Sequence, residues 1–136
     1  RHLKDAIEAL KGEGIRVSLF VEPEAEVMRA ACDLGAPAVE LHTGAYCDAV
    51  AAEDGARAAH ELARLRAAAE HGAAIGLEIH AGHGLDYDTA RAVAAIPEVV
   101  ELNIGHFIIG EALFCGLGEA VRTMREAMDA GRAGTR

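Results

Sequence analysis

Helical and strand patterns of apolar residues take turns along the chain, joined by short segments rich in Gly and Pro. Period-two or continuous apolar runs predict strands at Arg16–Val21, Ala38–His42, Ile75–His80 and Val99–Ile104. Helical spacing predicts helices at His2–Leu10, from Pro23 to about Leu34, at Ala56–Glu70 with His71 and Gly72 stopping it, from Asp86 or Asp88 to Ala95, at His106–Phe114 and at Leu117–Ala130. A polar loop is expected after His42, and residues 131–136 are expected to form a loose tail.

This alternation predicts an α/β fold in which parallel strands are joined by right-handed crossovers. A parallel sheet is covered on both faces, so its strands should be almost continuously apolar. Polar residues inside such strands are therefore informative.

Three of the predicted strands end in nearly the same word: VELHTG at 39–44, LEIHAG at 77–82 and VELNIG at 100–105. Because side chains alternate along a strand, each word places one polar pair on a single face. The pairs are Glu40 with His42, Glu78 with His80, and Glu101 with Asn103. The opposite face receives Val39, Leu41, Leu77, Ile79, Val100, Leu102 and Ile104.

Burying unpaired carboxylates is costly, so these polar faces are expected to gather around one axis. A (βα) barrel does this and collects the last polar residues at the carboxyl-terminal rim of its strands. A structural polar network is the alternative, and it is favoured for Glu78 and Glu101, which lie deeper in their strands. A closed eight-stranded barrel takes about 250 residues. A chain of 136 residues with four βα units and an extra helix therefore reads as a single segment, 1–136, equal to about half a barrel.

Glycine and histidine cluster after the last two predicted strands, in His80-Ala81-Gly82-His83-Gly84 and in Asn103-Ile104-Gly105-His106. Glycine lets a ligand approach the backbone, and a following helix start offers free N–H groups. Gly82, Gly84 and Gly105 are therefore candidates for a phosphate site, although such glycines can also simply turn the chain.

Histidine supplies the candidate chemistry. His83 lies between two glycines outside any periodic pattern, a position that suits general acid or base catalysis. His106 at a helix start could donate to a phosphate or serve as a structural cap. A metal site formed by His42, His80, His83 and His106 is an alternative, but H-x-x-H leaving a strand does not place two rings on one helical face.

Other reaction classes are disfavoured by composition. The only lysines, Lys4 and Lys11, lie in the first predicted helix, so a covalent Schiff base from a strand end is not expected. No Ser occupies a nucleophile elbow. Acid and base chemistry on a small phosphorylated substrate remains.

Charge and hydropathy limit the classes of binding partner and the cellular location that are expected. A formal net charge of −9, two Tyr, three Phe and no Trp argue against nucleic acid. No apolar stretch of about 18 residues indicates a membrane span, and the first residues do not resemble a secretory signal. Three Cys without a C-x-x-C pair are expected to be reduced thiols. A cytoplasmic location is expected.

Several of these words together resemble one family, pyridoxine 5′-phosphate synthase. They are RVSLFVEP, GAPAVELHTGAY and the long run HAGHGLDYDTARAVAAIPEVVELNIGHFIIGEALFCGLGEAVRTM, and they cover essentially the whole chain. The pairing of AGHGL at 81–85 with ELNIGH at 101–106 is specific to that family.

The resemblance implies the carboxyl-terminal half of a (βα)8 barrel that assembles as a homo-octamer. It implies condensation of 1-deoxy-D-xylulose 5-phosphate with 3-amino-2-oxopropyl phosphate to pyridoxine 5′-phosphate, phosphate and water, without an organic cofactor or a metal. By the same resemblance His83 is the proton donor, Gly84 contacts substrate, Gly105 and His106 hold phosphate, and Glu40 lies near the reacting substrate. The Schiff base of this reaction joins the two substrates, so no strand-end lysine is needed.

The chain also departs from the family pattern. The family's amino-terminal half, with its N-x-D-H strand, its phosphate-binding arginines and its proton-accepting histidine and glutamate, has no counterpart here. His80 stands where many members have asparagine, and Glu111 stands where many have arginine. The segment alone is therefore expected to be inactive. A stand-alone phosphate-binding half-barrel and another sugar-phosphate barrel enzyme, such as an isomerase or epimerase, are the alternatives.

Overall fold

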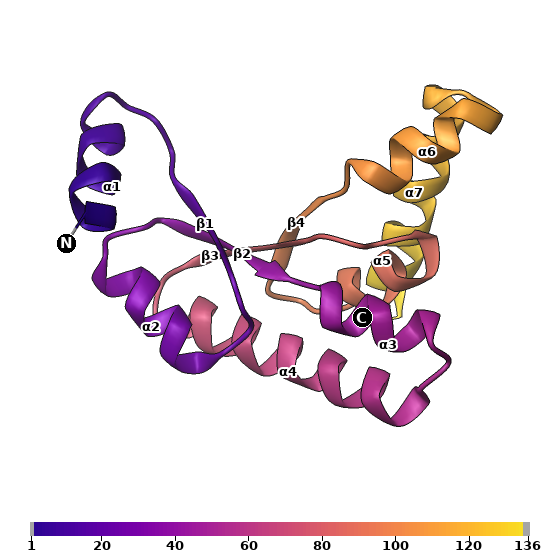
Figure 1. Cartoon of the computed structure of the whole chain (residues 1–136), viewed down its shortest axis with the longest axis horizontal. Coiled ribbons are helices and arrows are strands. Elements are labelled where there is room, and N and C mark those ends of the chain that lie inside the picture. The colour runs from indigo at the N-terminus through magenta and orange to yellow at the C-terminus, as the bar shows by residue number, and fades with distance from the viewer. Residues whose placement is uncertain (1, 135–136) are drawn as a thin grey trace.

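The computed structural model describes residues 2–134, in which strands and helices alternate as the sequence pattern predicts (Figure 1). The elements are α1 (His2–Gly12), β1 (Ser18–Val21), α2 (Ala25–Asp33), β2 (Ala38–His42), α3 (Gly44–Ala51), α4 (Gly55–Ala74), β3 (Glu78–Gly82), α5 (Tyr87–Ala94), β4 (Val99–Asn103), α6 (His106–Cys115) and α7 (Leu117–Ala133). None of the helices within 2–134 is both long and apolar enough to cross a membrane.

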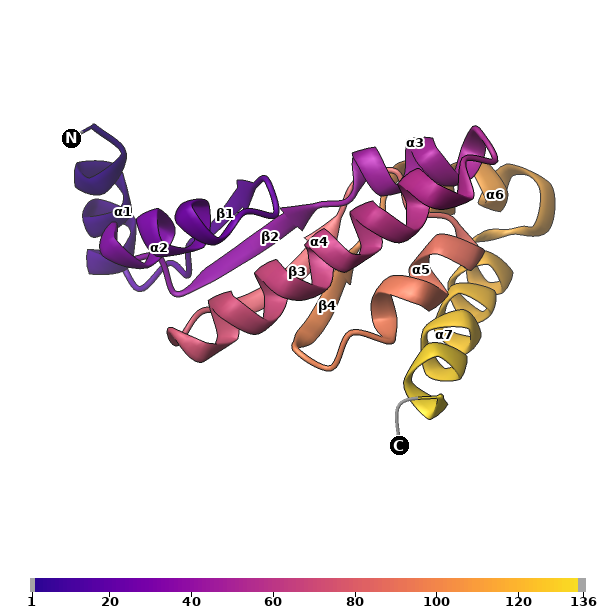
Figure 2. The ribbon, with the colours of Figure 1, turned by 90° about the horizontal axis from the view of Figure 1, so that it is seen from below.

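The four strands form one parallel sheet in the order β1-β2-β3-β4, which confirms the predicted parallel pairing. Helices α2, α4, α5 and α7 contribute to a core on one side of this sheet (Figure 2). Val39, Leu41 and Ile79 point into that core and are at most 1% exposed.

Polar side chains lie on the other face of the sheet and form rows across the strands. Phe20 pairs with Glu40, Glu40 with His80, and His80 with Glu101. The next row brings His42 beside Gly82 and Gly82 beside Asn103. The predicted pairing of polar residues on a shared face is therefore present.

This polar face is more exposed than a parallel sheet covered on both sides would be. Phe20 is 56% exposed, and the side chain of Glu101 is also 56% exposed. The described helices that build the core do so from the opposite side, so within residues 2–134 the sheet is covered on one face only.

The start of β4 differs from the prediction. The register shifts between Ile79 and His80, so that Val99 pairs with Ile79 and Glu101 with His80. Val100 is the extra residue of this irregularity and is 61% exposed, whereas Val99 is 2% exposed and takes the place in the core that was expected for Val100.

One helix was not predicted, and another ends later than predicted. The segment expected as a polar loop after His42 contains α3, whose residues Tyr46, Cys47 and Ala49 are buried. Helix α4 does not stop before His71 but continues to Ala74. It passes through Gly72 because this position packs on β3, where an added Cβ would lie 2.7 Å from the Cδ1 atom of Ile79.

The carboxyl-terminal helix is longer than predicted. Helix α7 reaches Ala133, so residues 131–133 are helical and not part of a loose tail. Gly131 is buried against α5, where an added Cβ would collide with the carbonyl oxygen of Arg91. Residues 135–136 of the expected tail lie outside the described residues.

Candidate active site

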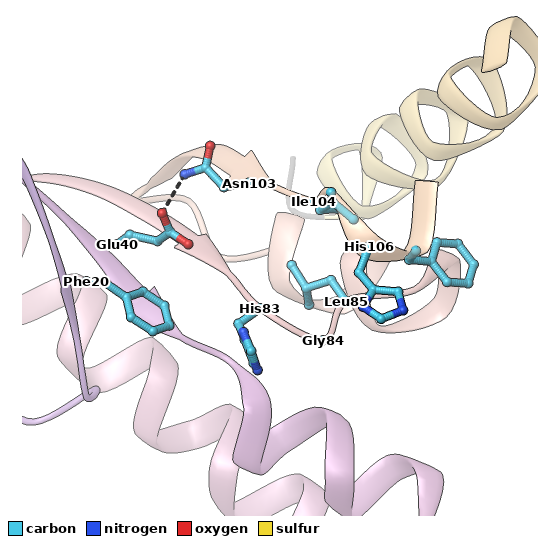
Figure 3. Close-up of a pocket in the computed structure, with 10 residues that line it drawn as sticks. Phe20, Glu40, His83, Gly84, Leu85, Asn103, Ile104 and His106 are labelled. Carbon is cyan, nitrogen blue, oxygen red and sulfur yellow. Dashed lines mark hydrogen bonds between the residues drawn. The ribbon is translucent and has the colours of Figure 1, made fainter. Parts of the chain in front are cut away.

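A cavity of about 610 Å³ opens at the carboxyl-terminal ends of the strands (Figure 3). Its wall is formed by residues of β1, β2 and β4, the loop after β3 and the start of α6. They are Phe20, Glu40, His83, Gly84, Leu85, Asn103, Ile104, Gly105, His106 and Phe107. The structure thus brings together five of the six predicted site residues, and the exception is Gly82.

The carboxylate of Glu40 is held from across the sheet. The side-chain amide of Asn103 donates a hydrogen bond of 2.9 Å to Oε2 of Glu40 (Figure 3). Gly82, on the strand between them, leaves the necessary space, because an added Cβ would collide with Oε1 of Glu40 and lie 2.7 Å from the carbonyl oxygen of Asn103. Gly82 lies beside this hydrogen bond and not on the cavity wall, so its expected contact with substrate stays a prediction.

The backbone of His83 has a conformation that is rare for residues other than glycine. Its φ is 81°, in the left-handed region. The fully buried hydroxyl of Thr43 lies 2.7 Å from the carbonyl oxygen of Gly82 and 2.6 Å from that of His83 and can donate to either. This contact fixes the turn that carries His83 out of β3, and the ring lies between Glu40 and His106 in the view of Figure 3.

Gly84 continues the same turn with a φ of 83°. An added Cβ at Gly84 would lie 3.3 Å from the Cβ of Cys47, so α3 supports this loop from below. The pKa of the Cys47 thiol is raised by burial, which is opposed by hydrogen bonds with Thr43 and Thr89. A raised pKa favours the neutral thiol, and Cys47 supports the loop by packing.

The last part of the wall is the amino-terminal end of α6. Gly105 is the N-cap residue and, because glycine has no side chain, it cannot cap the first backbone N–H groups. His106 is the first residue of the helix. The first backbone N–H groups of a helix lack partners within the helix and carry a partial positive charge. Together with the exposed imidazole of His106, they can hold an anion at this side of the cavity.

Below the cavity, His80 is 6% exposed and joins two carboxylates. Its Nε2 atom lies 2.8 Å from Oε1 of Glu78, and its Nδ1 atom lies 3.5 Å from Oε1 of Glu101. Arg16 also reaches Glu78, at 2.6 Å. These contacts agree with the alternative that Glu78 and Glu101 belong to a structural network, and the hydrogen bonds from His80 and then Arg16 lower the pKa of Glu78.

The four histidines considered as metal ligands are divided among different surroundings. His42 and His83 are neighbours, with ring centroids 4.8 Å apart, whereas His80 is bound between Glu78 and Glu101. Among residues 2–134 no group of three or more His, Cys, Asp or Glu side chains is arranged to hold a metal ion.

The sequence did not single out two residues that shape this site. Phe20 lines the cavity, whereas its sequence pattern indicated only an apolar strand residue. Thr43 was read only as part of the VELHTG word. Its role depends on contacts with Gly82 and His83, which lie 39 and 40 positions further along the chain.

Comparison with known proteins gives the same family as the resemblance. The family model described as "Pyridoxal phosphate biosynthesis protein PdxJ" matches residues 1–130. Relatives named pyridoxine 5′-phosphate synthase include one from Rhodospirillum rubrum, 58% identical over 133 residues that cover 98% of this chain and 52% of the relative. Another, from Xanthobacter autotrophicus, is 56% identical and covers 96% of this chain and 51% of the relative. A third, from Caulobacter vibrioides, is 54% identical and covers 97% and 52%.

The chain therefore belongs to the PdxJ family of pyridoxal phosphate biosynthesis proteins. It spans about half the length of the curated relatives that it matches.

Proposed function

We propose that the whole protein, meaning the full-length gene product that contains this chain, is a pyridoxine 5′-phosphate synthase. It condenses 1-deoxy-D-xylulose 5-phosphate with 3-amino-2-oxopropyl phosphate to form pyridoxine 5′-phosphate, phosphate and water. The observation that carries this proposal is the meeting of Glu40, His83 and the start of α6 at one cavity of about 610 Å³, in a chain of this family.

His83 is the proposed general acid. The two substrates join as an imine, and closing the pyridine ring then requires loss of water and of phosphate. An imidazole that is protonated near neutral pH can give a proton to each leaving oxygen. The left-handed turn at residues 83 and 84 supports this role, because it projects the ring from the strand end into the open part of the site.

Glu40 is the proposed partner for positive charge in the same reaction. An imine nitrogen becomes cationic when it is protonated, and a fixed carboxylate nearby stabilises that charge without having to reorganise. The hydrogen bond from Asn103 orients the Glu40 carboxylate and leaves its other oxygen, Oε1, without this donor.

The start of α6 is the proposed site for one substrate phosphate. Gly105, His106 and Phe107 at the start of α6 line the cavity, and Gly84 on the opposite loop would let substrate approach the backbone. No lysine is near, so the N–H groups and the imidazole would supply the attraction.

The sheet of this chain is proposed to be half of a closed (βα)8 barrel. Two observations support this proposal: within residues 2–134 the core lies on one face of the sheet, and the chain spans about half the length of its relatives. The other half would cover the polar face, add the remaining acid and base groups, and give a water-poor site.

A cytoplasmic homo-octamer is proposed by family resemblance. Exposed apolar residues on α6, Leu113 at 82% and Phe114 at 89%, are compatible with burial in a larger assembly. The mass of the whole protein in solution, measured by light scattering, tests this state.

The activity test is incubation of the purified whole protein with both substrates, followed at the absorbance of the pyridine product. Product should require both substrates, and phosphate should be released with it in equal amount. Each substrate alone serves as the control for an isomerase or epimerase. Absence of pyridine product with both substrates, or turnover of one substrate alone, would contradict the proposal.

The 136-residue chain by itself is proposed to form no product, because it lacks the amino-terminal groups described above. The same assay on the purified segment tests this. Formation of pyridoxine 5′-phosphate by the segment would show that residues 1–136 contain every necessary group.

A further inference from the structure

The ring of His42 is held between a carboxylate and the ring of His83. Its Nδ1 atom lies 2.8 Å from Oε1 of Glu22, which follows β1. Its ring centroid lies 4.8 Å from that of His83 with the planes at 61°, an edge-to-face contact. Phe20 packs against both imidazoles, with its ring 5.0 Å from His42 and 6.1 Å from His83.

The space for these two imidazoles is shaped by the backbone. An added Cβ at Gly44 would lie 2.7 Å from Nε2 of His42 and 3.4 Å from Cδ2 of His83, so a larger residue there would displace the ring of His42 from its present position. The Thr43 hydroxyl contacts the carbonyl oxygens of Gly82 and His83 and fixes the backbone of the His83 turn. Backbone and packing thus restrict His83 from two sides.

His42 does not line the 610 Å³ cavity that contains Glu40 and His106. It lines a second cavity of about 480 Å³ together with Glu22, and His83 belongs to the walls of both. His42 therefore reaches the first cavity through the two rings that it contacts there, His83 and Phe20.

We propose that Glu22 and His42 form a positioning pair for His83. Glu22 accepts a hydrogen bond from Nδ1–H of His42, which fixes the tautomer and the orientation of that ring. The oriented ring then holds the imidazole of His83 in the direction of the first cavity by edge-to-face packing. The catalytic part of this inference rests on the proposed function, whereas the structural part does not.

Several titratable groups surround the rings of His42 and His83. Groups that face the two rings are Glu22 before α2, Asp48 and the thiol of Cys47 on α3, Arg57 on α4, Asp86 before α5, and Glu40 and His106 across the first cavity. Among these groups Glu22 is the carboxylate in direct contact with His42, so its replacement by Gln removes the negative charge beside that ring.

The first test follows the imidazole signals of His83 in the whole protein by NMR across a pH titration. Glu22→Gln keeps an acceptor but removes the charge, and His42→Phe keeps a ring but removes the hydrogen bond. The matched controls are Glu24→Gln, which removes an equal charge from a residue that contacts Arg64, and His60→Phe on the exposed side of α4. The pair predicts altered His83 ring shifts in both Glu22→Gln and His42→Phe, and wild-type shifts in both controls.

The second test is the activity of the same variants. Glu22→Gln and His42→Phe should lower kcat about tenfold with KM nearly unchanged, less than the 10²–10⁴ expected for loss of the acid itself.

The NMR test and the activity test can each be contradicted independently of the other. Unchanged His83 signals in both variants would overturn the positioning pair whatever the activity is. Altered signals in a protein that forms no pyridine product would uphold the structural pairing and refute the proposed function.

Discussion

Asn103 on β4 donates its hydrogen bond to Glu40 on β2 across the whole width of β3, at the one position of that strand that has no side chain. The contact joins two of the three repeated polar words through the third. It explains why the LEIHAG word ends in glycine at a point where glycine makes no turn of positive φ.

Gly82→Ala should therefore damage the site without unfolding the protein. The added methyl group would collide with the Glu40 carboxylate and displace it from Asn103. We expect kcat/KM of the whole protein to fall about tenfold or more, because a misplaced catalytic group costs up to about 10² in rate. Gly118→Ala on α7, where nothing lies within 4 Å of the added atom, is the control. Wild-type kinetics in Gly82→Ala would separate Glu40 from the reaction.

His83→Ala in the whole protein should reduce turnover at least about a hundredfold with little loss of stability. His83 is exposed, so the loss of its ring contacts with His42 and Phe20 should cost little stability. His83→Asn is a useful companion because asparagine tolerates the left-handed backbone that this turn requires. Thermal unfolding measured beside the kinetics separates loss of the acid from loss of the fold. A variant within a few-fold of wild type would remove His83 from the acid role.

Stability at low pH should depend on Glu78. Its folded-state pKa is lowered below the ordinary 4.5 by hydrogen bonds from His80 and then from Arg16. A lowered folded-state pKa means that its stabilising contribution is complete above the unfolded-state value and is lost as the pH falls through the folded-state value. The difference in unfolding free energy between wild type and Glu78→Gln should therefore be constant near neutral pH and shrink in acid. Denaturant unfolding at several pH values measures it, and a difference that does not change with pH would contradict the assigned contacts.

The thiols should react at different rates. Cys47 is 9% exposed and burial raises its pKa, so its thiolate is scarce near pH 8, whereas Cys115 is exposed. A thiol reagent should label Cys115 quickly and Cys47 only slowly in the folded protein, and both quickly after unfolding. Cys115→Ser should abolish the fast phase. Rapid labelling of Cys47 in that variant would show that α3 opens readily.

The sequence was sufficient to predict that most of the candidate residues lie together, because its signal is local. Alternation within VELHTG, LEIHAG and VELNIG puts Glu40 and Asn103 on one face, and parallel pairing then puts them at one end of the sheet. The glycines around His83 likewise identified a turn that the structure shows.

The remaining features depend on contacts that no local pattern contains. Helix α3 was missed because the short helix that includes Tyr46 and Cys47 follows its strand with no loop and has only weak helical periodicity. The continuation of α4 through Gly72 depends on the approach of Ile79, and the pairing of Glu22 with His42 joins the residue that follows β1 to the last residue of β2.

The irregularity at the start of β4 has a further effect on the site. The strand contains one residue more than its ladder with β3 uses, and that residue is Val100. A chain shortened at Val100 would still match Val99 to Ile79 and Glu101 to His80 in an unbroken ladder. The extra residue is thus accommodated before Glu101, and Asn103, which donates to Glu40, remains opposite Gly82.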